Sequence, residues 1–206
     1  MLTKKQIALL KPFQRNIFQE YGFRELGRLA GEKSHNALQL ALKQFLKEKL
    51  VKERQIGVSK LYQLNTDNEA IYDYLELIKY GGLPKSAQYS IDSIKKEIEK
   101  YTLFYSLVIF GSYAFGEQKR DSDLDVAVLI PDETQRKKMD IAINMSEIHS
   151  LIHTHIFAFT FNEFFEMLTN KEANVGKEIA NKHRAVHNIN IFYKIIKKAL
   201  EHGFRY

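Results

Sequence analysis

The stretch LFYSLVIFGSYAFGEQKRDSDLDVAVLI, residues 103–130, decides the fold of the C-terminal half of this chain. Segment 103–110 is almost continuously apolar and rich in aromatic and branched residues, which predicts a buried strand. A Gly-Ser pair and one short helical turn follow. Segment 123–130 then predicts a second strand, which Pro131 ends because proline cannot donate a ladder hydrogen bond. Beyond it we expect a helix, a third strand and three further helical segments, near 134–152, 155–160, 161–170, 174–183 and 190–202. This order predicts an α+β domain with a small mixed sheet and C-terminal helices.

Two aspartates, Asp123 and Asp125, stand two residues apart at the start of the second predicted strand. Alternate residues of a strand share a face, so both carboxylates project to the same side. Carboxylates this close repel each other unless a cation lies between them. Oxygen ligands suit Mg²⁺, which takes its other ligands from water and substrate phosphate. Gly111 lets the backbone approach a phosphate closely, and the amides and hydroxyl around Ser112 can donate to phosphate oxygens. The combination predicts metal-assisted phosphoryl or nucleotidyl transfer.

The spacing of these residues resembles that of a known superfamily. In GSYAFGEQKRDSDLD, ten residues separate the Gly-Ser pair from Asp-x-Asp, and Gly116 and Ser122 also occupy expected places. This pattern resembles the DNA polymerase β-type nucleotidyltransferases, in particular the minimal nucleotidyltransferases, over roughly residues 88–206. The resemblance implies a nucleoside triphosphate substrate, with ATP expected, and a magnesium cofactor. It assigns nucleotide binding to Gly111 and Ser112, and metal binding and catalysis to Asp123 and Asp125.

Members of this superfamily commonly carry a third acid on the next strand, where it completes the metal site and helps to activate the acceptor hydroxyl. The best alignment places His155 at that position, and it expects Glu163 and Glu166 on the following helix. Three alternatives stay open. The site works with two aspartates, a different base such as neutral His155 serves, or catalysis has been lost while nucleotide binding remains. A weaker alternative is a zinc site in which His149 and His153, four apart on a predicted helix, join His155.

Charge divides the chain into two parts. Residues 1–66 hold 13 Lys and Arg against 5 Asp and Glu, a net charge of +8, whereas the remainder has a net charge of −2. A basic module joined to a mildly acidic one indicates that only the first meets a polyanion. Apolar spacing in this module predicts helices and then a β-hairpin, over 2–18, 23–30, 35–49 and 50–64. Gly31 is expected to end the second helix, Ser34 to cap the third, and Gly57 to form the hairpin turn.

This order of elements resembles the winged helix-turn-helix family of DNA-binding domains over about 60 residues. In that family the third helix enters the major groove of duplex DNA and the wing touches the backbone. The resemblance implies DNA contacts from Lys33, Ser34, His35, Asn36, Gln39 and Lys43, and phosphate contacts from Arg54 and Lys60. The alternative is a winged helix used only for protein contacts. Residues 67–87 are expected to form a helical linker, whose helix over 69–80 is a connector, a packing element or the contact of a homodimer.

The expected organisation is therefore a DNA-binding domain at 1–66, a linker, and a nucleotidyltransferase domain at 88–206. Minimal nucleotidyltransferases of this type often act as antitoxins that modify a HEPN-family toxin, typically on a tyrosine. The resemblance thus implies adenylyl transfer from ATP to a protein acceptor. The alternative is a transcription regulator whose nucleotidyltransferase domain only binds or senses nucleotide. A small-molecule transferase is a weaker third possibility. The sequence has no cysteine, signal-peptide pattern or long apolar run, so we expect a soluble cytoplasmic protein without membrane contact.

Overall fold

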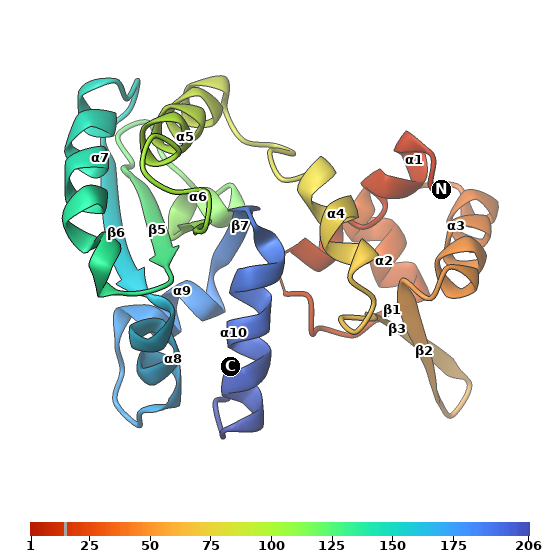
Figure 1. The fold of residues 1–206 in the computed structure, drawn as a ribbon. Coiled ribbons are helices and arrows are strands. Elements are labelled where there is room, and N and C mark those ends of the chain that lie inside the picture. Colours follow the sequence, from red (N-terminus) through yellow and green to blue (C-terminus); the bar gives the residue numbers. More distant parts are fainter. Residues whose placement is uncertain (15) are drawn as a thin grey trace. The chain divides into compact units, whose positions relative to one another are not determined.

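The computed structural model describes residues 1–14 and 16–206, which form two compact units, Met1–Gly81 and Gly82–Tyr206 (Figure 1). Each unit combines helices with its own sheet, so the fold is α+β. Within the described ranges, no helix has both the length and the apolar character needed to cross a membrane.

The first unit consists of short helices and a three-stranded antiparallel sheet of order β1-β3-β2. Its elements are α1 (Lys4–Ala8), the 3-10 helix η1 (Lys11–Gln14), β1 (Tyr21–Gly22), α2 (Phe23–Ala30), α3 (His35–Lys47), β2 (Val51–Ile56), β3 (Ser59–Leu64) and α4 (Ala70–Leu77). The helix α4 belongs to this unit, although its residues fall in the predicted linker. The Leu2 amide donates to the Tyr74 hydroxyl, and the Gln14 side chain donates to the Leu75 carbonyl.

Local signals set several ends of these elements as predicted. Ser34 Oγ accepts a hydrogen bond from the Ala37 amide and caps α3. Gly31 closes α2 with a φ of 70°, and Gly57 turns the hairpin with a φ of 57°; both values favour glycine. The predicted helix over 2–18 is wrong in length, because α1 ends at Ala8 and Pro12 lies in a 3-10 turn. Arg15, also in that predicted range, lies outside the described residues.

The second unit is built on a four-stranded mixed sheet of order β6-β5-β4-β7. β4 is antiparallel to β5 and β7, whereas β5 and β6 are parallel. The elements are α5 (Lys85–Ile98), β4 (Ser106–Phe110), α6 (Ser112–Phe115), β5 (Leu124–Ile130), η2 (Glu133–Gln135), α7 (Arg136–Ile148), β6 (Thr154–Thr160), α8 (Phe161–Thr169), α9 (Val175–Asn181), β7 (His183–His187) and α10 (Ile189–Glu201). Every residue of β4 is buried, as its apolar run predicts.

Two features of this unit differ from the sequence-based expectation. The sequence predicts the end of a helix and a loop at residues 183–187, but these residues instead form β7 and pair with β4 at the edge of the sheet. The helix predicted over 134–152 ends at Ile148, so His149 and His153 do not share a helix. Both differences affect the surroundings of the two aspartates.

Candidate active site

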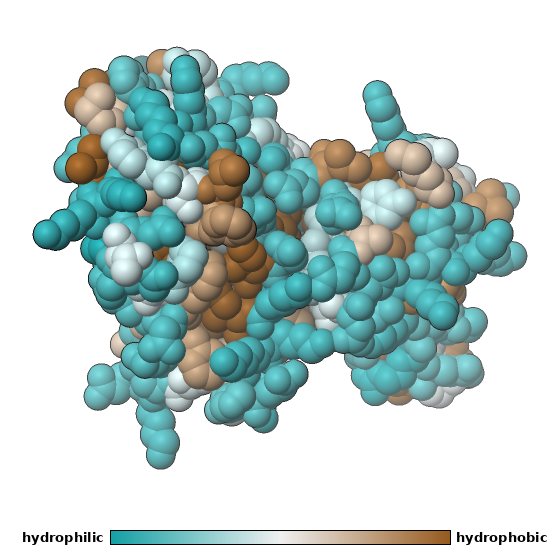
Figure 2. Space-filling model, viewed as in Figure 1, coloured by the Kyte–Doolittle hydropathy of each residue, from teal (hydrophilic) through white to brown (hydrophobic). Residues whose placement is uncertain are grey.

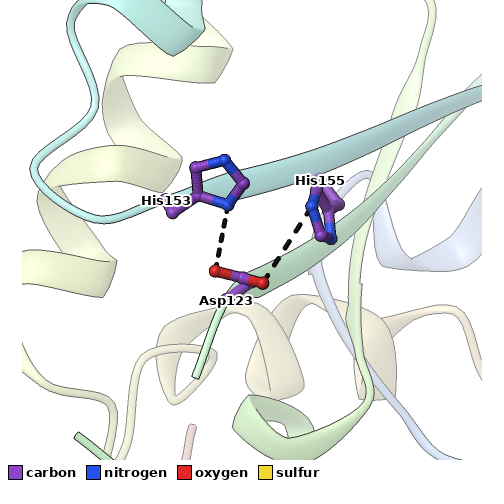
Figure 3. A group of neighbouring side chains, drawn as sticks. All are labelled: Asp123, His153 and His155. Carbon is purple, nitrogen blue, oxygen red and sulfur yellow. Dashed lines mark hydrogen bonds and ion pairs between the residues drawn. The ribbon is translucent and has the colours of Figure 1, made fainter. Parts of the chain in front are cut away.

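The parallel pairing of β5 and β6 brings two short sequence patterns side by side. The register sets Asp125 opposite His155, and the Leu124 amide donates to the His153 carbonyl at 2.9 Å. Asp123-x-Asp125 and His153-x-His155 therefore run next to each other with the same two-residue spacing. Residues two apart in strands share a face, so the acids and the imidazoles meet on one side of the sheet. Figure 3 shows His153 and His155 both turned toward Asp123.

The histidine nitrogens lie close to both carboxylates. His153 Nδ1 is 2.9 Å from Asp123 Oδ1. His155 Nε2 is 4.0 Å from Asp123 Oδ2, and its Nδ1 is 3.5 Å from Asp125 Oδ1. The two imidazole side chains are 71% and 49% exposed, whereas that of Asp125 is 29% exposed. The cluster is thus open to solvent on the histidine side and partly buried at Asp125.

The Gly-Ser pair lies at the same end of the sheet, because the last residue of β4, Phe110, is the register partner of Asp125. Gly111 has φ 67° and ψ −145°, a conformation that essentially only glycine adopts. A Cβ at this position would lie 2.6 Å from Asp125 Oδ2, closer than carbon and oxygen tolerate. Gly111 therefore lets the backbone pass directly beside the Asp125 carboxylate. Ser112 follows at the start of α6 and is half-buried.

The electrostatics of the cluster favour a bound cation. Burial raises the pKa of the Asp125 carboxyl above its ordinary value, and the charge of Asp123 acts in the same direction. The neighbouring His155 imidazole opposes both effects. A divalent cation would stabilise the ionised form of both carboxylates, because opposite charge within a few ångströms favours ionisation.

The donor atoms around this position are of two kinds, and they fit a divalent cation in different ways. Asp123 and Asp125 offer carboxylate oxygens, which Mg²⁺ prefers. His153 and His155 offer imidazole nitrogens, which suit zinc and other transition metals. The sequence-based expectation of magnesium therefore rests on the two aspartates alone. Within the described part of the chain, the group of His, Asp and Glu close enough to hold a metal ion together is Asp123, His153 and His155.

His153 is the site residue that the sequence pattern alone does not assign. The sequence suggests it only as the helical partner of His149, which in the structure follows the last residue of α7 and is absent from the cluster. The signal that points to His153 is the repeated spacing, since His-x-His mirrors Asp-x-Asp on the neighbouring parallel strand. The sequence alone does not show that the two patterns are adjacent; the register of β5 and β6 does.

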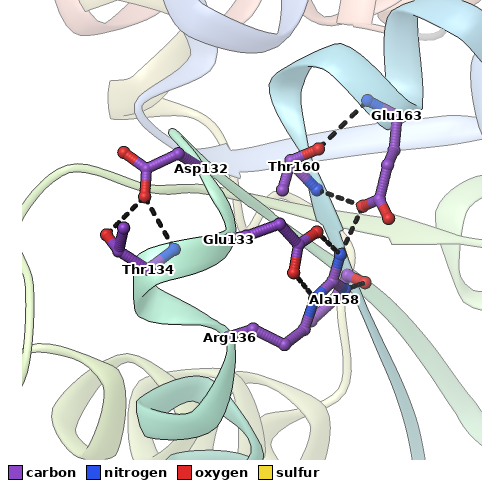
Figure 4. A network of polar contacts seen from close by, with 7 residues as sticks. All are labelled: Asp132, Glu133, Thr134, Arg136, Ala158, Thr160 and Glu163. Atoms are coloured by element: carbon purple, nitrogen blue, oxygen red, sulfur yellow. Dashed lines mark hydrogen bonds and ion pairs between the residues drawn. The ribbon is translucent and has the colours of Figure 1, made fainter.

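Glu163 and Glu166 lie on α8, as expected. Glu163 forms hydrogen bonds near the C-terminal ends of β5 and β6 (Figure 4). Its carboxylate accepts from the Thr160 amide at 2.7 Å, while the Thr160 hydroxyl accepts from the Glu163 amide, which forms a capping box. The Arg136 guanidinium binds the same carboxylate and also donates to the Ala158 carbonyl. Although partial burial acts to raise the pKa of Glu163, these hydrogen bonds hold it below its ordinary value. This glutamate is therefore committed to a structural network.

The side chains expected to contact DNA lie on the surface of the first unit. Lys33, Ser34, His35, Asn36, Gln39 and Lys43 are all exposed, at the start and along the outer face of α3. A groove of about 890 Å³ lies between α3 and the β2–β3 hairpin, and its lining includes His35, Gln39, Lys43 and Lys60. Arg54 is paired with Glu20, and Lys60 with Glu53 at 2.8 Å. Of the lysine and arginine side chains predicted to contact DNA, Lys33 and Lys43 form no ion pair with any described residue, so they are more available than Arg54 and Lys60.

A mixed sheet that joins a Gly-Ser turn to an Asp-x-Asp strand is the framework of a nucleotidyl-transferring domain. The chain belongs to the nucleotidyltransferase domain family, because the family model described as "Nucleotidyltransferase domain" matches residues 91–205. This match includes the Gly-Ser pair, both aspartates and both histidines of the cluster. A search of the curated proteins finds no match to the chain.

Proposed function

We propose that this protein is a divalent-metal-dependent nucleotidyltransferase that transfers an adenylyl group from ATP to a protein acceptor. The observation that carries the proposal is the close approach of Gly111 to Asp125, with Asp123 beside them, inside a matched nucleotidyltransferase domain. Families of this kind typically use a divalent metal and a nucleoside triphosphate. The resemblance to minimal nucleotidyltransferases supports a HEPN-type toxin as the acceptor, and hence an antitoxin role.

In this proposal the residues of the chain hold the substrate and receive a proton. Asp123 and Asp125 would hold the magnesium that enters with ATP, which when bound would supply positive charge against the triphosphate. Gly111 leaves space for a phosphate beside the backbone, and the Ser112 hydroxyl donates to a phosphate oxygen. The acceptor oxygen bonds to the α-phosphorus while the bond from that phosphorus to the bridging oxygen breaks. Pyrophosphate leaves, and the proton of the acceptor hydroxyl passes to a base. His155 is either that base, as a neutral imidazole, or a metal ligand.

The test is transfer of label from ATP that is radiolabelled at the α-phosphate to candidate HEPN-type proteins, with Mg²⁺ present. The Asp123→Asn, Asp125→Asn double variant should lower transfer more than about 100-fold, since metal stabilisation supplies several kcal/mol and each 1.36 kcal/mol is a factor of ten. Asp121→Asn is the matched control, because Asp121 is an exposed carboxylate two residues before the pair. Undiminished transfer by a folded double variant would refute the site.

We further propose that the first unit is a winged helix-turn-helix that binds duplex DNA. The order α1, β1, α2, α3, β2, β3, with the hairpin after the exposed helix α3, supports this assignment. The net charge of +8 on residues 1–66 supports a polyanionic partner. The visible surface around the hairpin is mainly hydrophilic (Figure 2), although Ile56 and Val58 beside the turn are exposed apolar side chains. With this unit the protein would act on its acceptor and also repress its own operon.

A second candidate function is a DNA-binding regulator whose nucleotidyltransferase domain only senses nucleotide. The observation that favours it is His155 at the position where a third acid is expected, on a strand, β6, that carries no carboxylate. The two functions differ in one experiment. A sensor would bind ATP and change its affinity for DNA without transferring label, whereas the transferase would label its acceptor.

A further inference from the structure

We propose that Asp123, His153 and His155 bind a transition-metal dication of the zinc or cobalt type, in addition to the magnesium that enters with ATP. The site deepens the proposed function, on which it rests for its place next to the nucleotide. The histidines would replace the third carboxylate of a site made only of acids. The second cation would then be a different element from the first, which is magnesium.

The geometry of the three side chains requires only a small closure around an ion. One ligand atom from each lies within 4.8 Å of the other two. The separations from Asp123 oxygens are 2.9 Å to His153 and 4.0 Å to His155. Ligands about 2.0–2.2 Å from zinc in a tetrahedron are roughly 3.3–3.6 Å apart, so these distances bracket the required one. Both histidines are exposed enough to rotate into place.

A second contact, between His155 and Asp125, would orient His155 as a metal ligand. Its two ring nitrogens face different carboxylates, Nε2 toward Asp123 and Nδ1 toward Asp125. When Nε2 binds the ion together with Asp123, Nδ1–H is left to donate to Asp125. A metal-bound histidine commonly donates its other nitrogen to a carboxylate, which fixes the ring and its tautomer. Asp125 would therefore serve both the magnesium and the orientation of His155.

The composition of the site decides which ion it prefers. Replacing an acid by neutral imidazoles removes negative charge and oxygen donors, and both changes weaken a site for magnesium. Imidazole nitrogen instead favours first-row transition metals, whose affinity generally rises from manganese toward copper, with zinc below copper. Three protein ligands also leave at least one position open, as in catalytic zinc sites, where water or an acceptor oxygen can bind.

The test measures metal binding without nucleotide and without turnover. The full chain is stripped with a chelator, and Co²⁺ is added while visible absorption and heat of binding are recorded. One Co²⁺ per chain should bind, Zn²⁺ should displace it, and equimolar Mg²⁺ should not. His153→Ala and His155→Gln should each weaken Co²⁺ binding at least about tenfold, since loss of even an outer-shell partner has that effect. His149→Ala is the matched control, because His149 is exposed and outside the cluster.

Each outcome decides the proposal. Equal Co²⁺ affinity in wild type and His153→Ala, or displacement of Co²⁺ by equimolar Mg²⁺, would overturn it. Thermal unfolding of the metal-free variants shows whether a loss of binding comes from a loss of fold. If label transfer occurs with Mg²⁺ but no Co²⁺ site exists, only this inference is wrong. If Co²⁺ binds through the histidines and no acceptor is ever labelled, the metal site stands and the proposed transfer fails.

Discussion

The close approach of Gly111 to Asp125 predicts a large effect of adding a single methyl group. In Gly111→Ala the new Cβ would meet Asp125 Oδ2 at 2.6 Å, and the backbone would keep φ 67° and ψ −145°. A non-glycine residue in such a conformation costs about 1–3 kcal/mol, and the clash forces the carboxylate to move. We expect Gly111→Ala to lower the free energy of unfolding by at least about 2 kcal/mol and to weaken cation-dependent ATP binding.

Gly116 provides the matched control for this variant. It ends α6 with φ 73°, and a Cβ there meets no atom within 4 Å. Gly116→Ala should therefore show only the left-handed backbone cost of about 1–2 kcal/mol. Urea denaturation of the full chain, monitored on the second unit, gives both values.

A double-mutant cycle isolates the clash itself. In an Asp125→Ala background the carboxylate is gone, so Gly111→Ala should cost only its backbone strain of about 1–3 kcal/mol. The two substitutions should thus couple by about 1 kcal/mol or more, as contacting residues do. A coupling near zero would show that Gly111 does not hold Asp125 in place, and the reasoning about the site would be wrong.

Two further predictions concern other parts of the chain. His183 is fully buried, with Nδ1 against the Ala180 carbonyl and Nε2 against the Tyr193 hydroxyl, and burial lowers its pKa to about 4. The unfolded state therefore binds a proton at a higher pH than the folded state, and the free energy of unfolding should fall by about 3 kcal/mol as the pH drops from 6.5 to 4. Urea titrations of His183→Gln should lack this pH-dependent loss. If the free energies of unfolding of wild type and variant changed equally with pH, the prediction would be contradicted. For DNA binding, Lys43→Ala in the full chain should weaken the affinity for all duplex sequences alike and reduce the slope of log affinity against log salt concentration by about 1. Fluorescence anisotropy measures both quantities, and an unchanged slope would exclude a contact between Lys43 and a phosphate.

Features set by local chemistry can be predicted from the sequence. The Ser34 cap, the Gly31 helix end and the Gly57 turn each depend on one residue and its immediate neighbours, and all three are confirmed. The apolar runs that form β4 and β5 are also predictable, because strands covered on both faces leave a continuous signal.

Features set by distant partners cannot be predicted in this way. The segment HRAVH is too short to show a clear period, and it becomes β7 only because β4 offers a free edge. His153 is an exposed residue in a connecting segment, and nothing near it in the sequence points to Asp123. His153 lies beside Asp123 because β5 and β6 pair in parallel, although a helix of 13 residues lies between these strands in the sequence. Pairing across such a distance is a property of the folded sheet.

The cluster of Asp123, His153 and His155 forms in only one register of the parallel strands β5 and β6. A slip of β6 by a single residue would set Thr154 opposite Asp125 and turn both histidines to the other face of the sheet. The Arg136 network opposes such a slip, since it ties the start of α7 to β6 and to the cap of α8. Affinity for a metal ion would therefore report whether this chain has paired its strands correctly, so a bound ion would favour the native register over every competitor.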